Sequence, residues 1–173
     1  NVKKTSEQRD IGKGLMSVFE ITDASERERA CRDLIKALPD WFGIRRVNRQ
    51  YIKEAGDYAA LGYRENACDE IQAMLVYKKM SDEVLGKDAL NIHWMGVHPE
   101  LHRKGIGAHL ISRVLEKASD EGISHVTVET LNPKAGDEFY LKTYAFYKSF
   151  GFTPYEEVEY NLTNPIVRLY RQL

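Results

Sequence analysis

The chain has 173 residues, 43% of them hydrophobic, and a formal net charge of -1. This length and apolar content are typical of one domain with its own core, so we expect a single domain over residues 1–173. The near-neutral charge argues against non-specific nucleic-acid binding. The lack of a long apolar run or a leader-like start predicts a cytoplasmic protein without a membrane span. Cys31 and Cys68 have no metal-ligand or redox spacing, and we expect reduced thiols.

The first half of the chain predicts two helices set among strands. Asp23 followed by Glu26 is a capping-box-like helix start, and Pro39 lies just beyond the expected helix end. Apolar residues alternate from Ile71 to Tyr77, which is typical of a strand with one face on the core. In order, we expect a strand over 14–21, helices over 23–38 and 45–55, and strands over 58–63 and 70–77.

The second half predicts further alternation of strands and helices. Residues 81–88 are polar and contain Gly86, so we expect an irregular connection there. The elements expected after it are a strand from residue 90, a helix from Ile106, a strand over 124–131, a loop over 132–138, a helix over 139–150, and strands over 152–160 and 165–171.

The most informative stretch is residues 91–115, NIHWMGVHPELHRKGIGAHLISRVL. A short apolar strand leads through a loop with Gly105 and Gly107 into an amphipathic helix. The first amides of a helix have no intrahelical partners, and the helix dipole adds positive charge there. Arg103 and Lys104 add two mobile cations. The segment therefore predicts an anion site that suits a pyrophosphate.

Two common phosphate-binding loops do not fit this segment. A P-loop needs its lysine after the second glycine, and the dinucleotide fingerprint needs a third glycine where Leu110 stands. The pattern instead resembles motif A of the GNAT superfamily of acetyl-CoA-dependent N-acetyltransferases, which reads Gln/Arg-x-x-Gly-x-Gly/Ala after a strand. His102 departs from the motif at its first position, and Gly105 and Gly107 match the other two.

A second resemblance lies downstream. Residues 143–152, TYAFYKSFGF, are similar to the family's motif B helix, which carries a tyrosine four residues before a Gly-Phe pair. Here that tyrosine is Tyr147, followed by Gly151-Phe152. The resemblance implies a GNAT-like α/β fold, with a mixed, mostly antiparallel sheet flanked by helices and a central pair of strands that splays apart.

The resemblance also implies acetyl-CoA as the cosubstrate. Its pantetheine would meet unpaired backbone groups of Met95, Gly96 and Val97 in the splay, and a glycine inside a strand is itself consistent with close approach of a ligand or with a plain β-bulge. Tyr140 stands where many members carry an asparagine that contacts the cofactor, and Asn132 is the alternative for that contact. The residues expected at the pyrophosphate are His102, Arg103, Lys104, Gly105, Ile106, Gly107 and Ala108.

Acyl transfer to an amine requires a base for the amine and an acid for the departing thiolate. Tyr147 is the expected acid, because a phenol is protonated at neutral pH. His93 is the expected base, since strand alternation would put it on the same face as Met95. Glu129 and Glu70 are the alternatives, and a core role for His93 stays open.

The acceptor is expected to be a primary amine of a small molecule or peptide that attacks acetyl-CoA directly in a ternary complex. Walls of its site would come from Trp41, Phe42 and Tyr144, and core packing stays open as the alternative for Trp41 and Phe42. Glu157 and Glu159 would attract a cationic amine if they are not simply solvated charges. The histidines have no ligand spacing, so we expect no metal.

Three other interpretations remain open for the sequence. The chain could bind acetyl-CoA without transfer, as a sensor or pseudoenzyme. It could bind a different nucleotide, or bind nucleic acid or a protein partner as its main role. We expect a monomer or homodimer.

Overall fold

The computed structural model describes residues 18–67, 69–159 and 164–173. Expectations for residues 14–17, for Cys68 and for Tyr160 fall outside them. The helices are α1 (Ala24–Ala37), α2 (Arg45–Asp57), α3 (Ile106–Asp120) and α4 (Glu138–Ser149), and the strands are β1 (Val18–Glu20), β2 (Ala59–Tyr63), β3 (Ala73–Asp82), β4 (Lys87–Val97), β5 (His125–Leu131), β6 (Thr153–Glu159) and β7 (Pro165–Gln172). Short 3₁₀ turns cover Pro99–Leu101 and Pro133–Ala135.

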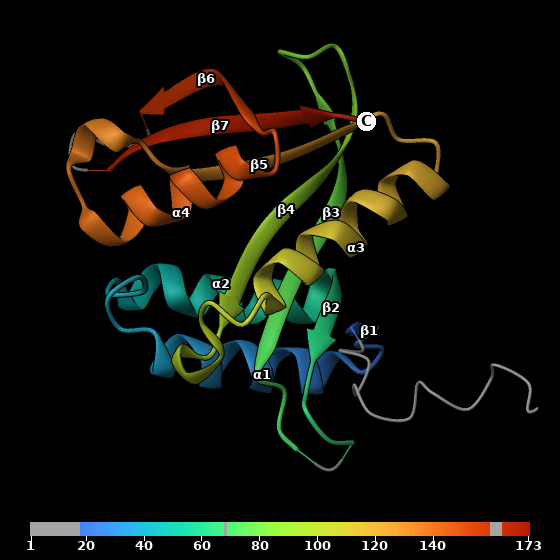
Figure 1. Cartoon of the computed structure of the whole chain (residues 1–173), viewed down its shortest axis with the longest axis vertical. Coiled ribbons are helices and arrows are strands. Elements are labelled where there is room, and N and C mark those ends of the chain that lie inside the picture. Colours follow the sequence, from blue (N-terminus) through green and yellow to red (C-terminus); the bar gives the residue numbers. More distant parts are fainter. Residues whose placement is uncertain (1–17, 68, 160–163) are drawn as a thin grey trace, which may run out of the picture.

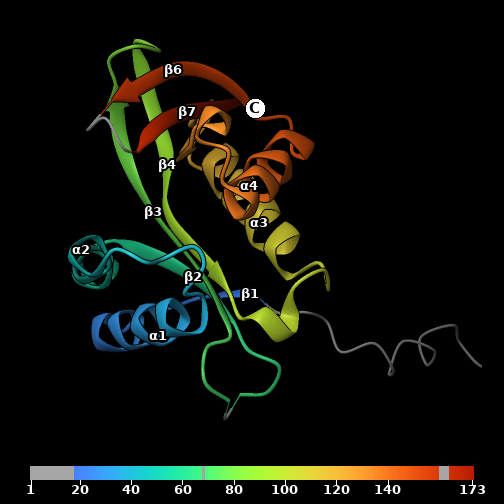
Figure 2. The same cartoon turned by 90° about the vertical axis from the view of Figure 1, so that its left-hand side faces the viewer.

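The strands form one sheet with the order β1-β2-β3-β4-β5-β7-β6. Every neighbouring pair is antiparallel except β4 and β5, which run parallel. Helices α1 and α2 cover one face of the sheet, and α3 and α4 lie against the other (Figures 1 and 2). The expected mixed, mostly antiparallel sheet flanked by helices is confirmed.

Each face of the sheet has its own apolar layer, because side chains alternate between faces along a strand. On the α3 side, Leu110 and Val114 pack in one cluster with Leu75 of β3. On the α1 side, Leu34 packs in a second cluster with Met74. The two layers define two sides, called below the α3/α4 side and the α1/α2 side.

Capping fixes where the helices beside the site begin. The Asp23 carboxylate accepts a 2.7 Å hydrogen bond from the Glu26 amide, as the sequence predicts for α1. Asp137 caps α4 in the same way, because its carboxylate accepts from the amides of Phe139 and Tyr140. This cap fixes the start of the helix that carries Tyr147.

The irregular connection expected over residues 81–88 is wrong. Strand β3 runs on to Asp82 and β4 begins at Lys87, with Asp82 and Lys87 paired, so the two strands form a long hairpin. Its turn includes Gly86, whose φ of 63° lies in the left-handed region. The end of this hairpin is polar because much of it is exposed to solvent, and polarity there is compatible with a strand.

The central strands β4 and β5 splay apart. Their ladder pairs only Leu90–Ile92 with Val126–Val128. Beyond Ile92, β4 remains paired with β3 up to Val97. Beyond Val128, β5 remains paired with β7 up to Leu131. The expected splayed pair is confirmed, and beyond Ile92 and Val128 the facing edges of the two strands are not paired with each other.

Candidate active site

The loop before α3 forms a cradle at the helix N-terminus. Gly105 is the N-cap with φ of 82°, and no side chain caps the helix. Arg103, with φ of 62°, is the only residue other than glycine that has a positive φ in the described part of the chain. The His109 amide donates to the Gly105 carbonyl, so the amides of residues 106–108 precede the first intrahelical bond and point out of the helix.

Space above this cradle is limited by α4. A Cβ atom at Gly107 would lie 3.4 Å from Cζ of Phe146 and 3.8 Å from the Val97 side chain. Ile106 is 2% exposed, so it can offer a ligand only its backbone amide. The backbone at Gly107 is therefore close to neighbouring elements, whereas a Cβ atom at Gly105 would meet nothing within 4 Å.

His102 lies at the mouth of the cradle but is turned toward β4. Its Nε2 atom lies 2.7 Å from the carbonyl oxygen of Val97. Its ring also meets the Trp41 indole edge-on, with ring centroids 5.7 Å apart. His102 thus links the loop to the end of β4, and a contact with a cofactor stays a prediction.

The backbone of β4 offers free groups to the splay at two of the three predicted residues. The His98 amide donates to the Gln72 carbonyl of the neighbouring segment. Paired residues in an antiparallel ladder alternate between hydrogen-bonded and non-bonded pairs. With the observed register, this alternation directs the N–H and C=O groups of Met95 and Val97 away from β3 and toward the splay. The Val97 carbonyl already has His102 as its partner, so the groups left for a ligand are those of Met95 and the Val97 amide.

The prediction that Gly96 offers its backbone to the splay is wrong, because the same alternation pairs Gly96 with Met74 of β3. Steric packing explains why a glycine stands at this position. A Cβ atom there would lie 2.5 Å from Cη2 of Trp94 and 3.3 Å from Cδ1 of Leu38. Gly96 makes room for packing on the α1/α2 side.

Thr130 is a candidate site residue that the sequence did not reveal. It lies on β5 beyond the last pair with β4, is 5% exposed, and its Oγ1 atom has no hydrogen-bond partner among the described residues. Alternation from the buried Val128 directs it to the α3/α4 side. A buried hydroxyl without a partner is costly, so its position at the splay fits a polar ligand. The sequence does not distinguish Thr130 from any other threonine in a strand, so this position could not be predicted.

Tyr147 lies on the α3/α4 side in the apolar cluster formed with Ile92, Val128 and Phe152. Burial, with a smaller contribution from Tyr140, raises the pKa of the Tyr147 phenol above its ordinary range. The hydroxyl makes no hydrogen bond to the described residues. A neutral phenol beside the splay is a proton donor at any physiological pH.

The prediction that His93 shares a face with Met95 is wrong. Val76 pairs with Trp94 and Tyr77 pairs with Ile92, so His93 is the extra residue of a β-bulge. The bulge shifts the alternation, and His93 faces α2. Its ring lies between Tyr51 and Tyr58, with centroids 6.0 Å and 5.1 Å away.

His93 has a carboxylate partner that the sequence did not reveal. Its Nε2 atom lies 2.6 Å from Oε2 of Glu54 on α2, with side chains that are 17% and 20% exposed. Burial raises the pKa of Glu54, but hydrogen bonds from Gln50 and His93 and nearby positive charge outweigh it and hold that pKa below its usual value. The two residues are 39 positions apart, and only the packing of α2 on the sheet brings them together.

The two alternative cofactor contacts already have partners inside the protein. Tyr140 donates from its hydroxyl to the Trp41 carbonyl oxygen at 2.6 Å. The Asn132 side chain accepts from the Lys134 amide as the cap of a 3₁₀ turn. Either residue has to exchange these bonds to contact a ligand through its side chain.

The three aromatic residues expected at the acceptor lie in two places, Trp41 and Phe42 in the turn after α1 and Tyr144 on α4. Trp41 packs edge-on against Phe139 and donates from Nε1 to Thr143 Oγ1 at 3.3 Å, which ties the turn to α4. Phe42 packs on the α1/α2 side against Tyr51 and Trp94. Tyr144 is partly buried on α4 beside the α3/α4 cluster.

The acidic residues on β6 and β5 are largely neutralised by cations. Glu157 makes a two-pronged ion pair with Lys134, at 2.8 and 2.9 Å, and this hydrogen bond holds the pKa of Glu157 below its usual value. Glu159 is exposed at the end of β6. Glu129, one alternative base, pairs with Arg168 at 2.7 Å. The other, Glu70, is exposed in the loop before β3.

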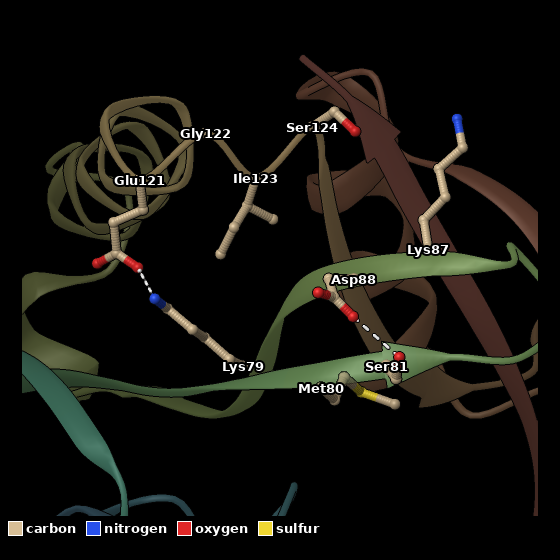
Figure 3. A pocket seen from close by; sticks show the side chains of 9 residues that line it. All are labelled: Lys79, Met80, Ser81, Lys87, Asp88, Glu121, Gly122, Ile123 and Ser124. Atoms are coloured by element: carbon tan, nitrogen blue, oxygen red, sulfur yellow. Dashed lines mark hydrogen bonds and ion pairs between the residues drawn. The ribbon is translucent and has the colours of Figure 1, made fainter.

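A cavity of about 580 Å³ lies far from the cradle. Lys79 and Glu121 form an ion pair in it, and Ser81 bonds Asp88 (Figure 3). It sits where β4 and β5 begin and α3 ends, whereas the cradle is at the start of α3. It therefore lacks the free helix amides that an anion site would use.

Three further features concern membrane helices, metal ligands and thiols. Within residues 18–67, 69–159 and 164–173, no helix has the length and apolar character that a membrane crossing requires. In the same residues, no group of three or more His, Cys, Asp or Glu side chains is placed to hold a metal ion. Cys31 is a buried free thiol whose pKa is raised to about 12 by burial.

Comparisons with known proteins agree with this geometry. The model of the acetyltransferase (GNAT) family matches residues 15–152. A search of curated proteins gives no match. Among similar solved structures is a protein from Desulfovibrio desulfuricans described as a GNAT-family acetyltransferase, with 15% identity, a TM-score of 0.73 and coverage of 90% of this chain and 99% of that chain. The ribosomal-protein-S18-alanine N-acetyltransferase of Escherichia coli has 14% identity, a TM-score of 0.66 and coverage of 90% of this chain and 94% of that chain. A Bacillus subtilis acetyltransferase in complex with CoA has 19% identity, a TM-score of 0.57 and coverage of 91% of this chain and 97% of that chain.

A splayed parallel pair of strands, followed by a glycine loop and an uncapped helix N-terminus, is an α/β arrangement of the acyltransferase class. The match over residues 15–152 is more than half of the sequence, and the chain therefore belongs to the GNAT acetyltransferase family. The solved structures, at these identities, show that the fold is shared.

Proposed function

We propose that the protein transfers the acetyl group of acetyl-CoA to a primary amine of a small molecule or peptide by direct attack in a ternary complex. The observation that carries this proposal is the splay between β4 and β5. Tyr147 lies on the α3/α4 side of the sheet and His93 on the α1/α2 side. We infer that a donor and an acceptor meet from opposite sides of the sheet where the ladder between β4 and β5 ends.

The residues present fit acetyl-CoA. The uncapped start of α3 offers amides and helix dipole for the pyrophosphate, with Arg103 and Lys104 exposed beside it. The backbone groups of Met95, the Val97 amide and the unpartnered Thr130 hydroxyl offer hydrogen bonds along the splay. The B. subtilis relative is solved with CoA, which supports the same ligand here.

The roles assigned to His93 and Tyr147 follow from the protons that acyl transfer to an amine has to move. His93 takes a proton from the acceptor ammonium, directly or through water, because only the neutral amine is nucleophilic. The amine nitrogen forms a bond to the thioester carbonyl carbon and the C–S bond breaks. Tyr147 donates a proton to the departing thiolate. The nitrogen, which is protonated after the attack, releases its second proton, and this proton restores the Tyr147 phenol through water. His93 returns its proton to solvent, and the products are an acetylated amine and CoA.

The acceptor class follows from what surrounds His93. Tyr51, Tyr58 and Phe42 form an aromatic, partly buried wall on the α1/α2 side. This wall suits an amine with an apolar neighbour, such as a peptide N-terminus or an aromatic amine. The E. coli relative is named for acetylation of a protein alanine, which supports testing peptides first.

The test measures CoA release from acetyl-CoA with a panel of peptides and small amines. Tyr147→Phe keeps the ring and its packing, so turnover should fall by roughly 10²–10⁴-fold while acetyl-CoA affinity stays within about twofold. Acetyl-CoA binding without release for every amine would favour the sensor interpretation. Equal turnover by the variant would move the acid role to another group.

A further inference from the structure

We infer that Glu54 is a positioning residue for the proposed base His93, holding its imidazole so that Nδ1 is the nitrogen that accepts the acceptor's proton. This inference rests on the proposed function and adds a residue to it. Glu54 lies on α2, outside both family motifs, and its carboxylate reaches His93 across the α1/α2 side of the sheet.

The geometry fixes the imidazole from three sides. Oε2 of Glu54 lies 2.6 Å from Nε2, and the rings of Tyr51 and Tyr58 meet the imidazole edge-on at 74° and 85°. Such a fixed ring can present only its other nitrogen to a ligand. Nδ1 has no hydrogen-bond partner among residues 18–67, 69–159 and 164–173.

The position of His93 on β4 places the pair beside the splay, where the proposed acceptor would meet the thioester. The last pair between β4 and β5 is Ile92 with Val128. His93 is the next residue of β4, so the bulge that turns it toward α2 lies where the splay begins. A regular strand would have put this side chain on the α3/α4 side with Tyr147.

Charge at the pair favours one tautomer. Glu54 is held ionised, so it accepts a proton from Nε2–H and leaves the lone pair on Nδ1. The carboxylate also stabilises the imidazolium that forms after proton transfer. The other titratable groups facing the pair are Tyr51, Tyr58 and Lys78, whose ammonium lies 4.6 Å from the centre of the Tyr58 ring.

Glu54 itself is kept in place by its own helix. Gln50, one turn earlier on α2, donates from Nε2 to Oε1 of Glu54 at 3.0 Å. One carboxylate oxygen thus anchors to the helix and the other faces His93. This division of roles is what a positioning residue requires, whereas a simple surface ion pair would leave both side chains mobile.

The first measurement needs no substrate. In ¹⁵N-NMR spectra of the full chain, neutral His93 should carry its proton on Nε2. In Glu54→Gln, a neutral amide replaces the carboxylate, so the preference of the proton for Nε2 should weaken and both neutral tautomers should become visible. A proton on Nδ1 in the unmodified protein, or an unchanged tautomer preference in the variant, would overturn the inference whether or not the protein turns over acetyl-CoA.

The second measurement is kinetic. Glu54→Gln should lower kcat by about 10- to 100-fold and shift the acidic limb of the pH–rate profile to lower pH, with KM for acetyl-CoA unchanged within about twofold. Asp57→Asn makes the same carboxylate-to-amide change at the end of α2 and should leave both unchanged. The double variant Glu54→Gln/His93→Gln should be no slower than His93→Gln. Additive losses would show that Glu54 does not act through His93.

The two measurements separate the inference from the proposed function. An NMR result as expected, together with no CoA release by any amine in the unmodified protein, would support the pair and refute the transferase activity. CoA release that is insensitive to Glu54→Gln would do the opposite.

Discussion

The hydroxyl of Tyr140 on α4 donates a 2.6 Å hydrogen bond to the carbonyl oxygen of Trp41, in the turn between α1 and α2. The two residues are 99 positions apart. Trp41 in turn touches His102 of the loop before α3. One turn therefore contacts both the helix that carries Tyr147 and the loop that forms the cradle.

Tyr140→Phe should loosen this turn while keeping the ring. Loss of one partly buried hydrogen bond costs about 1 kcal/mol, or a few degrees in Tm. The larger effect should be a rise in KM for the amine, because Trp41 and Phe42 sit in the same turn. Ser149→Ala removes a comparable bond, to the Phe146 carbonyl oxygen at the end of the same helix, and should leave that KM unchanged. Equal effects of the two variants on KM would contradict a role for the turn.

Gly107→Asp should abolish acetyl-CoA binding. The new carboxylate would occupy the first turn of α3, where it suits the helix dipole, so the unliganded protein should keep its Tm. It would repel a pyrophosphate at the same place. Thermal shift with acetyl-CoA measures the difference, since a ligand stabilises in proportion to the logarithm of its concentration over Kd.

The steric control for this change is Gly107→Ala. Its Cβ would lie 3.4 Å from Phe146, a tight but tolerable distance, so most of the acetyl-CoA shift should survive. A full shift in the aspartate variant would place the anion elsewhere.

Gly96→Ala should destabilise the protein by about 1–3 kcal/mol through overpacking. The added methyl would enter the space of the Trp94 ring and of Leu38 on the α1/α2 side. Denaturant unfolding measures this cost. Gly43→Ala is the matched control, because its nearest atom would be the Pro39 carbonyl oxygen at 4.0 Å. If both variants unfold alike, packing does not explain the glycine.

Tyr155→Phe should reduce stability without changing turnover. The Tyr155 hydroxyl donates to Oδ2 of Asp82 at 2.6 Å, far along the β3–β4 hairpin from the site. Burial raises the pKa of Asp82, but this bond and the amides of Leu85 and Val84 outweigh it and hold that pKa below its usual value. Stability from the carboxylate is therefore present above its unfolded pKa of about 3.9 and lost as pH falls further.

The variant should consequently show a weaker loss of stability between about pH 4 and pH 2 than the unmodified protein. Urea unfolding at pH 7, pH 4 and pH 3 gives the comparison. An identical pH dependence in both proteins would show that Tyr155 does not set the charge state of Asp82.

The local parts of the site could be predicted from the sequence, because a strand, a glycine loop and a helix N-terminus follow one another within residues 91–115. Tyr147 could be placed relative to Gly151-Phe152 for the same reason. His93 was put on the wrong face because simple alternation assumes a regular strand, and a bulge leaves no composition signal. Glu54 and Thr130 could not be found, since only tertiary packing gives them their neighbours.

The short joint between β4 and β5 has a mechanical consequence. Three residue pairs, Leu90–Ile92 with Val126–Val128, are the only direct ladder between the two halves of the sheet in the residues that the structure describes. A small rotation about this joint leaves Ile92 and Val128 nearly in place but moves Val97 and Leu131 apart. Under the proposed function, the long arm of acetyl-CoA would enter at the wide end, while the spacing at the narrow end would stay almost constant.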